Sequence, residues 1–275
     1  MDSPAASTFD RAAFETRLRT RRLGRSLIAR SEVPSTNDLA WEGLASGVPE
    51  GTVVVADAQT RGRGRGGRTW LSPPGLGLAL SVAVVPGCDP GSAGTLPLIA
   101  GLALERGLDT LGARVDLKWP NDLMLGGRKL AGILCESRRG PGASAFGDAT
   151  VIGVGVNVLQ GREDFPPELR EHATSLAIER IPATREAVAA AFLDALEPLL
   201  EALEDGGAGP LLEAWRARAS FFGTPVRVRT PGGELEGIAR ALDPRGALVI
   251  EDAGGREHVV LAGDVEPLPA TGGGT

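Results

Sequence analysis

The sequence predicts an α+β domain, with helices flanking a mixed, largely antiparallel sheet, followed by a small all-β domain. Short apolar runs typical of strands are interleaved with longer segments in which apolar residues recur at helical spacing. After Gly223 the helical spacing stops, and short β-rich runs alternate with turns roughly ten residues apart. A chain of 275 residues is long enough to bury one large core and a second, smaller one.

Predicted helices and strands alternate in the first part of the chain. An arginine-rich amphipathic helix is expected at residues 9–22, and residues 1–8 are expected to fray. Ser35, followed by Asp38 three residues later, fits a capping box at the start of a helix that runs to Gly47. Strands are expected at 27–33, 52–58 and 76–85, and a mostly helical segment is expected at 90–111.

A hairpin and two helices are predicted next. One strand ends within 115–122, Gly126 and Gly127 mark the turn, and a strand returns over 129–137 with Gly132 in its middle. A polar loop at 138–147 precedes a strand at 150–158. Helices are expected at 183–205, broken or bent at Pro198, and at 211–219. Four β-rich runs follow from Pro225, and residues 269–275 are expected to form a flexible tail.

Composition favours a cytoplasmic protein and argues against general nucleic-acid binding. The net charge is −6, whereas a nucleic-acid binder is usually basic over at least one whole face. No apolar run approaches the ~20 residues of a membrane span, and residues 1–10 lack the pattern of a secretory signal. The two cysteines, Cys88 and Cys135, are too few for a disulfide framework and fit a reducing compartment.

Residues 59–70 read Gln-Thr-Arg-Gly-Arg-Gly-Arg-Gly-Gly-Arg-Thr-Trp and lie between two predicted strands. Glycine lets the backbone approach a ligand closely, and arginine offers a permanent charge and a fork of donors that suits phosphate or carboxylate. We therefore expect this arginine–glycine loop to fold around an anion. It is neither a P-loop nor a Rossmann motif, since Gly62 and Gly64 precede a strand and do not open a helix.

Two residue types are rare, and the lysines are also clustered. The chain has two lysines, Lys118 and Lys129, within one twelve-residue window, and three asparagines, Asn37, Asn121 and Asn157. Arginine serves elsewhere as the general positive charge, so a retained lysine suggests a need for a compact ammonium group. The alternative is that the two lysines lie close together by chance and are simply solvated surface residues.

Polar side chains at the predicted strand ends form a cationic, amide-rich set with a single acid, Asp122. Such a set suits two anionic substrates, a carboxylate and a nucleoside triphosphate, with Asp122 available to hold Mg²⁺. The sequence shows no Ser/His/Asp set of the hydrolase kind. The set comprises Ser35, Thr36, Asn37, Gln59, Arg63, Arg65, Arg68, Lys118, Asn121, Asp122, Lys129 and Asn157.

Five motifs, in their order along the chain, resemble those of biotin–protein ligases. They are Ser35-Thr36-Asn37, the loop from Gly62 to Trp70, Lys118-Trp119-Pro120-Asn121-Asp122, the run from Arg128 to Leu134, and Gly153-Val154-Gly155-Val156-Asn157. The resemblance implies a class II aminoacyl-tRNA synthetase-like ligase domain over residues 1–222. It also implies a small SH3-like β-barrel over residues 223–268.

The resemblance further implies a two-step reaction that uses ATP, Mg²⁺ and biotin. The biotin carboxylate attacks the α-phosphorus of ATP to give biotinyl-5′-adenylate, and a lysine of a biotin carboxyl carrier domain, as in acetyl-CoA carboxylase, then attacks the anhydride. The implied catalytic residues are Lys129, Arg65 and Asp122, the last also as a Mg²⁺ ligand. Biotin is expected to meet Ser35, Thr36, Asn37, Gln59, Gly62, Arg63, Arg65, Lys129 and Gly132. The nucleotide is expected to meet Arg65, Arg68, Trp70, Lys118, Asn121 and Asn157.

The same residues also have purely structural interpretations. Ser35, Thr36 and Asn37 fit a helix cap, Trp70 and Trp119 fit core aromatics, and Asn157 fits a polar group that satisfies the backbone at a strand end. The resemblance favours the functional interpretation most for Lys129, Arg65 and Gln59.

Two other function classes stay open. Arg-Gly segments also occur in nucleic-acid-binding proteins, although there they are long and repeated. A lipoate or octanoate ligase would share the fold but not this form of the loop. About thirty residues precede the motifs, so we expect no N-terminal DNA-binding domain, no nucleic-acid partner and no membrane partner. A homodimer is a further expectation, as is a loop that is disordered when empty and closes over the adenylate.

Overall fold

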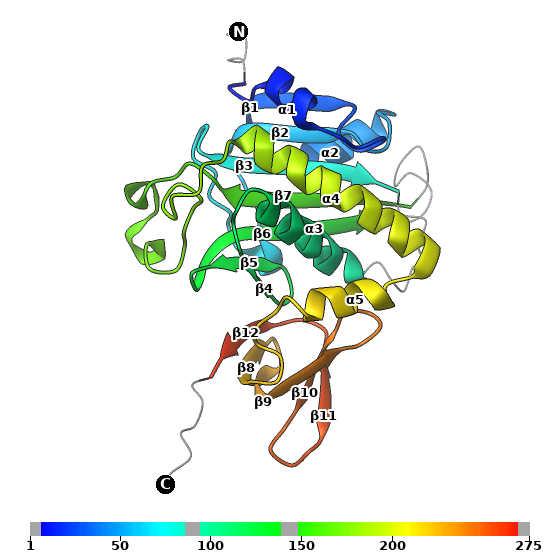
Figure 1. The fold of residues 1–275 in the computed structure, drawn as a ribbon, viewed down its shortest axis with the longest axis vertical. Coiled ribbons are helices and arrows are strands. Elements are labelled where there is room, and N and C mark those ends of the chain that lie inside the picture. The colour runs from blue at the N-terminus through cyan, green and yellow to red at the C-terminus, as the bar shows by residue number, and fades with distance from the viewer. Residues whose placement is uncertain (1–6, 86–93, 139–147, 269–275) are drawn as a thin grey trace.

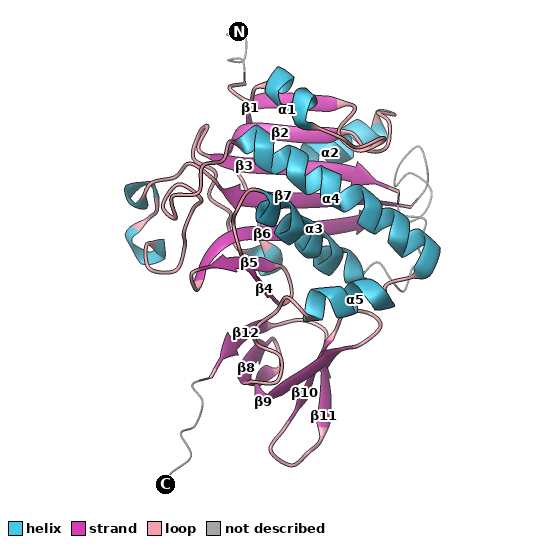
Figure 2. Cartoon of the chain, viewed as in Figure 1, coloured by secondary structure: helices cyan, strands magenta, loops and turns pink. Residues whose placement is uncertain are grey.

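The computed structural model describes residues 7–85, 94–138 and 148–268. Within them, a seven-stranded sheet flanked by helices is followed by a five-stranded sheet at the C-terminal end (Figure 1). Figure 2 shows the same division: nearly all of the helices belong to the first part of the chain. Several sequence-based expectations fall outside the described residues: those on residues 1–6, Cys88, the first residues of the predicted 90–111 helix, most of the 138–147 loop, and the 269–275 tail.

The large sheet is mixed, as predicted. Its strand order is β1-β2-β3-β7-β6-β5-β4; β1 and β2 run parallel, and every other neighbouring pair is antiparallel. The strands are β1 (Leu27–Val33), β2 (Val53–Gln59), β3 (Gly77–Val84), β4 (Asp116–Lys118), β5 (Asp122–Leu125), β6 (Arg128–Arg138) and β7 (Ala149–Asn157).

Helices cover both faces of this sheet. On one face lie α1 (Arg11–Arg17), α3 (Leu96–Thr110) and α4 (Arg185–Gly206), and on the other lies α2 (Thr36–Ala45) (Figure 1). Val53 and Val55 belong to the core shared with α3 and α4, whereas Val54 packs with Trp41 and Leu44 of α2. Successive strand side chains point to opposite faces, and helices cover both faces here. For this reason β2 is apolar along most of its length.

The first helix is shorter than predicted, and the helix that contains Pro198 lacks the predicted break. Helix α1 ends at Arg17 and not at residue 22. The carboxylate of Glu197 accepts hydrogen bonds from the backbone N–H groups of Arg21, Arg22 and Leu23, which holds that segment in a turn beside α4. Helix α4 is not broken at Pro198, since it continues as one helix of 22 residues.

The C-terminal sheet has five strands, where four β-rich runs were predicted. Its order is β11-β10-β9-β8-β12, and its members are β8 (Pro225–Thr230), β9 (Gly233–Leu242), β10 (Leu248–Glu251), β11 (Glu257–Val260) and β12 (Asp264–Pro267). The fourth predicted run divides at residues 261–263, where no proline or paired turn residues announce a turn. A Cβ at Gly263 would lie 2.7 Å from the backbone oxygen of Arg229, so close approach of two strands requires glycine there.

Helix α5 (Gly209–Arg216) and Trp119 connect the two sheets. Trp119 is 2% exposed, and its Nε1 donates to the backbone oxygen of Gly246 at 3.0 Å. Trp119 is therefore a core aromatic that joins the large sheet to the C-terminal sheet. Among the described residues, no helix combines the length and apolar character needed to cross a membrane.

Candidate active site

A cavity of about 240 Å³ opens on the α2 face of the large sheet. Helix α2 packs on Ala83 and Val151 and leaves the next part of this face open, where β6 and β7 present glycines. The arginine–glycine loop borders the cavity, and so does the segment from 164 to 173. The structure thus brings together Ser35, Thr36, Asn37, Gln59, Arg63, Arg65, Arg68, Trp70, Asn121, Lys129, Gly132 and Asn157 from the predicted set.

Three predicted residues lie beside the cavity and not in its lining. Gly62 lies within the arginine–glycine loop, where its backbone oxygen accepts from Trp70 N at 3.0 Å. Lys118 and Asp122 face each other in the β4–β5 hairpin. Asp122 is linked to the cavity indirectly, because it accepts a hydrogen bond from the ammonium of Lys129, which lines the cavity.

The floor of the cavity needs glycine. A Cβ at Gly153 would lie 2.2 Å from Asn37 Oδ1, and one at Gly155 would lie 2.3 Å from Trp70 Cε2. The indole of Trp70 also lies near Gly132, where a Cβ would be 3.3 Å from the ring. Trp70 therefore lies flat on β6 and β7 and fills part of the cavity floor.

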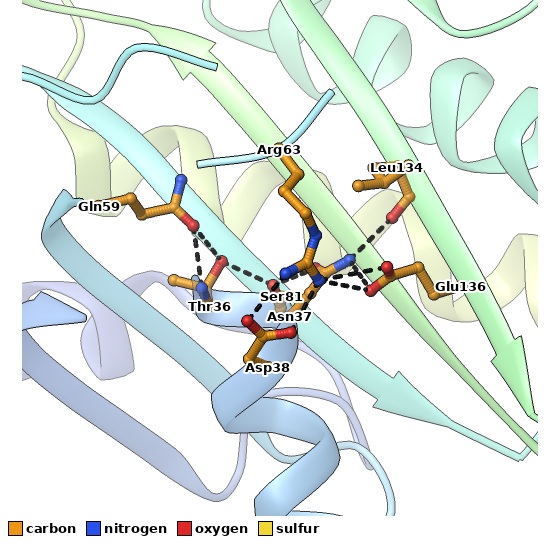
Figure 3. A network of polar contacts seen from close by, with 8 residues as sticks. All are labelled: Thr36, Asn37, Asp38, Gln59, Arg63, Ser81, Leu134 and Glu136. Carbon is orange, nitrogen blue, oxygen red and sulfur yellow. Dashed lines mark hydrogen bonds and ion pairs between the residues drawn. The ribbon is translucent and has the colours of Figure 1, made fainter. Parts of the chain in front are cut away.

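A chain of polar contacts lies at the start of α2 (Figure 3). Gln59 Oε1 accepts from Thr36 N at 2.9 Å and from Thr36 Oγ1 at 3.2 Å. Ser81 Oγ lies 2.8 Å from Thr36 Oγ1 and 2.6 Å from Asn37 Oδ1. Asn37 Nδ2 donates to Glu136 Oε2 at 2.8 Å and to the Leu134 backbone oxygen at 3.3 Å. Hydroxyl and amide groups thus line this end of the site.

The predicted capping box does not form. Ser35 is the N-cap residue of α2, but its side chain makes no capping hydrogen bond. Asp38 instead accepts from both terminal nitrogens of Arg63 at 2.8 Å. The hydrogen bond from Arg63 lowers the pKa of Asp38, and the hydrogen bond to Asp38 raises the pKa of Arg63. Asp38 therefore anchors the arginine–glycine loop to α2.

Lys129 is held at the start of β6 by its backbone and its ammonium group. Its N donates to the His172 oxygen at 2.7 Å, and its oxygen accepts from Thr174 N at 2.9 Å. Its Nζ donates to Asp122 Oδ1 at 2.7 Å and lies 5.7 Å from the centre of the Trp70 ring. The Lys129 side chain is about one-third exposed and lines the cavity, so a ligand there can contact it.

The C-terminal sheet contacts the arginine–glycine loop. Arg68 donates from both terminal nitrogens to the carboxylate of Asp264 at 3.1 Å, and Arg65 Nη1 donates to the Gly263 oxygen at 3.3 Å. Arg65 also lies over the Trp119 ring at 5.9 Å. Burial lowers the pKa of Arg65. Two arginines that were expected to meet phosphate thus border both the cavity and the C-terminal sheet.

Comparison with known proteins agrees with this arrangement. Residues 29–157 match the model of the biotin/lipoate A/B protein ligase family, and residues 221–266 match the biotin protein ligase C-terminal domain. A biotin–[acetyl-CoA-carboxylase] ligase of Mycobacterium tuberculosis is 40% identical over 256 residues, which cover 89% of this chain and 90% of that protein. The chain belongs to the biotin protein ligase family.

Other relatives of the biotin protein ligase family extend the match. The bifunctional ligase/repressor BirA of Bacillus spizizenii is 35% identical over 253 residues, covering 90% of this chain and 76% of that protein. The solved biotin protein ligase from Aquifex aeolicus, in complex with biotin and ATP, matches with a TM-score of 0.73 at 29% identity, covering 90% of this chain and 100% of that chain. The shared fold is the α+β ligase fold expected from the motifs.

Within this biotin protein ligase fold, both remaining asparagines bind backbone. Asn157 is 5% exposed; its Nδ2 donates to the Thr174 oxygen at 2.9 Å, and its Oδ1 accepts from Gln160 Nε2 at 3.2 Å. Asn121 Nδ2 donates to the Ile133 oxygen at 2.8 Å. Asn157 therefore has the structural role weighed from the sequence, Asn121 bonds the backbone of β6, and nucleotide contact by either stays a prediction.

Four residues at the site were not predicted from the sequence: Ser81, Glu136, His172 and Asp264. Ser81 had a signal: Gly77, Ala79, Ser81 and Ala83 share one face of β3 because strand side chains alternate, and Ser81 is the polar member of that face. Glu136 lies four residues after Gly132 on the same face of β6, so strand alternation would have placed it there. His172 and Asp264 reach the site only through tertiary contacts, and no local pattern marks them.

The described residues contain no group of three or more His, Cys, Asp or Glu side chains that could hold a metal ion. Asp122 is engaged with Lys129 at 2.7 Å. A site for Mg²⁺ made by the protein alone therefore does not fit these residues. Mg²⁺ commonly enters such sites with substrate phosphates and few protein ligands.

Proposed function

We propose that this chain forms biotinyl-5′-AMP from biotin and ATP and then transfers biotin to a lysine of a biotin carboxyl carrier protein. The observation that carries the proposal is one cavity with two chemically different ends. Hydroxyl and amide groups line the end of the cavity at α2, whereas Lys129 and the loop arginines supply positive charge in the rest of its lining. Biotin has a neutral ring urea at one end and a carboxylate at the other, and ATP adds a polyanion.

Charge neutralisation is the main chemical task of this site. In the first step a carboxylate oxygen of biotin attacks the α-phosphorus, and the bond to pyrophosphate breaks. Both reactants are anionic, so the Lys129 ammonium is proposed to lie between the carboxylate and the α-phosphate. In the second step the carrier lysine attacks the acyl carbon, AMP leaves, and the attacking nitrogen loses a proton. Asp122 is proposed to orient Lys129 or the incoming amine.

The remaining roles are proposals supported by position at the cavity. For biotin we propose Ser35, Thr36, Asn37, Gln59, Gly62, Arg63, Arg65, Lys129 and Gly132. For the nucleotide we propose Arg65, Arg68, Trp70, Lys118, Asn121 and Asn157. We propose that Mg²⁺ is held mainly by the phosphates of ATP, because Asp122 is paired with Lys129.

The carrier domain is the proposed protein partner, and we propose that the enzyme acts in the cytoplasm without nucleic acid. The net charge of −6 supports the proposal that nucleic acid is not a partner. We also propose a homodimer. Beyond Ile133, whose backbone is bonded to Asn121, no strand pairs with this edge of β6 among the described residues, and unpaired strand edges readily pair with another chain.

We propose two domains, over residues 1–222 and 223–268, with 269–275 as a tail. The last helix, α5, ends at Arg216, and the first strand of the C-terminal sheet begins at Pro225. This change from helix to strand supports a boundary at Gly223, where φ is +76°.

Biotin-dependent exchange of labelled pyrophosphate into ATP tests the first step, and labelling of a purified carrier domain tests the second. We expect exchange with biotin and none with lipoate or octanoate. Exchange with lipoate alone would reassign the substrate, and no exchange with either acid would refute the proposal. A gel-shift assay at varied salt tests the nucleic-acid alternative, and light scattering tests the dimer.

A further inference from the structure

The carboxylate of Glu136 accepts hydrogen bonds from two residues of the site. Its Oε2 accepts from Asn37 Nδ2 at 2.8 Å, and its two oxygens lie 3.2 and 3.3 Å from Arg63 Nη2 (Figure 3). Arg63 has a second carboxylate partner in Asp38, with two contacts of 2.8 Å. For Asn37, the alternative acceptor is the Leu134 oxygen at the longer distance of 3.3 Å. Glu136 is therefore the nearest acceptor for the Asn37 amide, whereas Arg63 is already held by Asp38.

We propose that Glu136 is a positioning residue that fixes the direction of the hydrogen bonds at the end of the site that recognises a cyclic urea. This proposal rests on the proposed placement of the biotin ring beside Thr36 and Asn37. Glu136 does not itself need to touch the substrate.

The direction follows from the donors and acceptors that each group has. A carboxylate only accepts, so the Asn37 amide must turn its Nδ2 toward Glu136 and its Oδ1 toward Ser81. Ser81 has one proton for two contacts, and the shorter contact, at 2.6 Å, is with Asn37 Oδ1. With that proton used, the Thr36 hydroxyl receives none from Ser81. The Thr36 hydroxyl then donates its own proton to Ser81 or Gln59, and the lone pairs of Thr36 Oγ1 stay free to accept from an N–H group of the ligand.

Burial makes this arrangement rigid. Ser81 is 0% exposed and Asn37 is 4% exposed, so water cannot readily replace a lost partner. If the Asn37 amide rotated by half a turn, its oxygen would face two acceptors, Glu136 and the Leu134 carbonyl. Gly153 lies directly beneath the amide, where a Cβ would be 2.2 Å from Asn37 Oδ1. The amide is therefore confined between strand β7 and the carboxylate.

The ligand that this arrangement suits has N–H donors beside a carbonyl. A ring urea offers two N–H groups and one oxygen, whereas a ring guanidine, as in 2-iminobiotin, offers an additional nitrogen in place of that oxygen. A site with fixed directions distinguishes the two, because a mismatch leaves a buried polar group unpaired. A site whose Asn37 amide rotates freely distinguishes them less.

The test compares Glu136→Leu with Glu136→Gln in the pyrophosphate exchange assay. Leucine removes both acceptors, so we expect the KM for biotin to rise about tenfold or more, with a smaller change in kcat, and the preference for biotin over 2-iminobiotin to fall. Glutamine keeps one acceptor oxygen for Asn37, so E136Q should lie within roughly threefold of the wild type on both measures. An unchanged KM for E136L would overturn the proposal.

Two further variants separate this role from charge and from folding. If Glu136 acted only through its charge on Arg63, E136Q would be as damaging as E136L, and Asp38→Asn would reproduce the loss of selectivity; either result overturns the proposal. Glu251→Leu is the matched control, because Glu251 pairs with Arg240 and is 34% exposed against 32% for Glu136. Wild-type enzyme that shows no exchange with biotin would refute the proposed function, whereas active wild type with unaltered E136L would refute only this inference.

Discussion

Arg68 and Asp264, 196 positions apart, form a bidentate ion pair, in which Nη1 and Nη2 of Arg68 each lie 3.1 Å from a carboxylate oxygen of Asp264. The guanidinium fork fits a carboxylate and a phosphate with nearly the same geometry. Asp264 therefore occupies, on the C-terminal sheet, the donors that we assign to the phosphates of ATP. The C-terminal sheet and the nucleotide are expected to compete for Arg68.

Replacing Asp264 tests this competition. Asp264→Asn keeps the shape and removes the charge, so the KM for ATP should fall roughly two- to fivefold, while the KM for biotin stays unchanged. Both partners are about half exposed, so unfolding free energy should change by less than about 1 kcal/mol. Steady-state exchange at varied ATP measures the effect, with Glu266→Gln on the same strand as control. A higher KM for ATP would mean that Asp264 holds Arg68 in place for the nucleotide.

Lys129→Ala should reduce biotin-dependent exchange by roughly 10²–10³-fold, the usual effect of removing one donor that stabilises developing charge. The Lys129 side chain is 34% exposed, so the fold should tolerate the change. Rates at saturating biotin and ATP distinguish a loss of kcat from weaker binding. Near-normal exchange by a folded variant would contradict the role assigned to this lysine.

Gly155→Ala should displace the Trp70 indole, because the added Cβ would lie 2.3 Å from Cε2. Overpacking of this kind costs about 1–3 kcal/mol, and we expect both weaker biotin binding and a lower Tm. Combining it with Trp70→Leu should recover the lost stability. Gly209→Ala is the control, since a Cβ there meets nothing within 4 Å. If G155A left Tm and biotin binding unchanged, the tryptophan would not be packed on β7 in solution.

Stability at acidic pH should depend on Glu197. Burial alone would raise the pKa of Glu197, but the backbone N–H groups of Arg21, Leu23 and Arg22 outweigh it and lower the pKa below the ordinary value of 4.5. A lowered folded-state pKa means that this carboxylate stabilises the fold fully above the unfolded value. The contribution is lost as pH falls through the lower, folded-state pKa.

Urea unfolding of wild type and Glu197→Gln measures this contribution. At pH 7 the variant should be less stable by roughly 1–3 kcal/mol, because a charged acceptor of three backbone N–H groups is lost. The difference should shrink below pH 4.5, where the wild-type carboxylate takes up its proton. A difference that stayed constant down to acid pH would contradict the assignment.

Local patterns predicted most of the fold. The strands predicted at residues 27–33 and 150–158 match β1 and β7 to within one residue at each end. The predictions failed where a distant group decided the outcome. The first helix stops early because Glu197 captures the backbone of residues 21–23, and Asp38 leaves the capping box because Arg63 is a stronger partner.

For the active site, the motif residues came from the sequence, and their pairing did not. The resemblance of the ordered motifs to biotin protein ligases selected Lys129, Gln59 and the loop arginines as candidates, and the structure places Lys129, Gln59, Arg63, Arg65 and Arg68 at one cavity. That Trp70 lies on Gly155, that Asp264 holds Arg68, and that Glu136 orients Asn37 was decided only by tertiary structure. Strand and helix periodicity reflects which face a residue takes, whereas these contacts depend on how strands far apart in the chain are aligned in space.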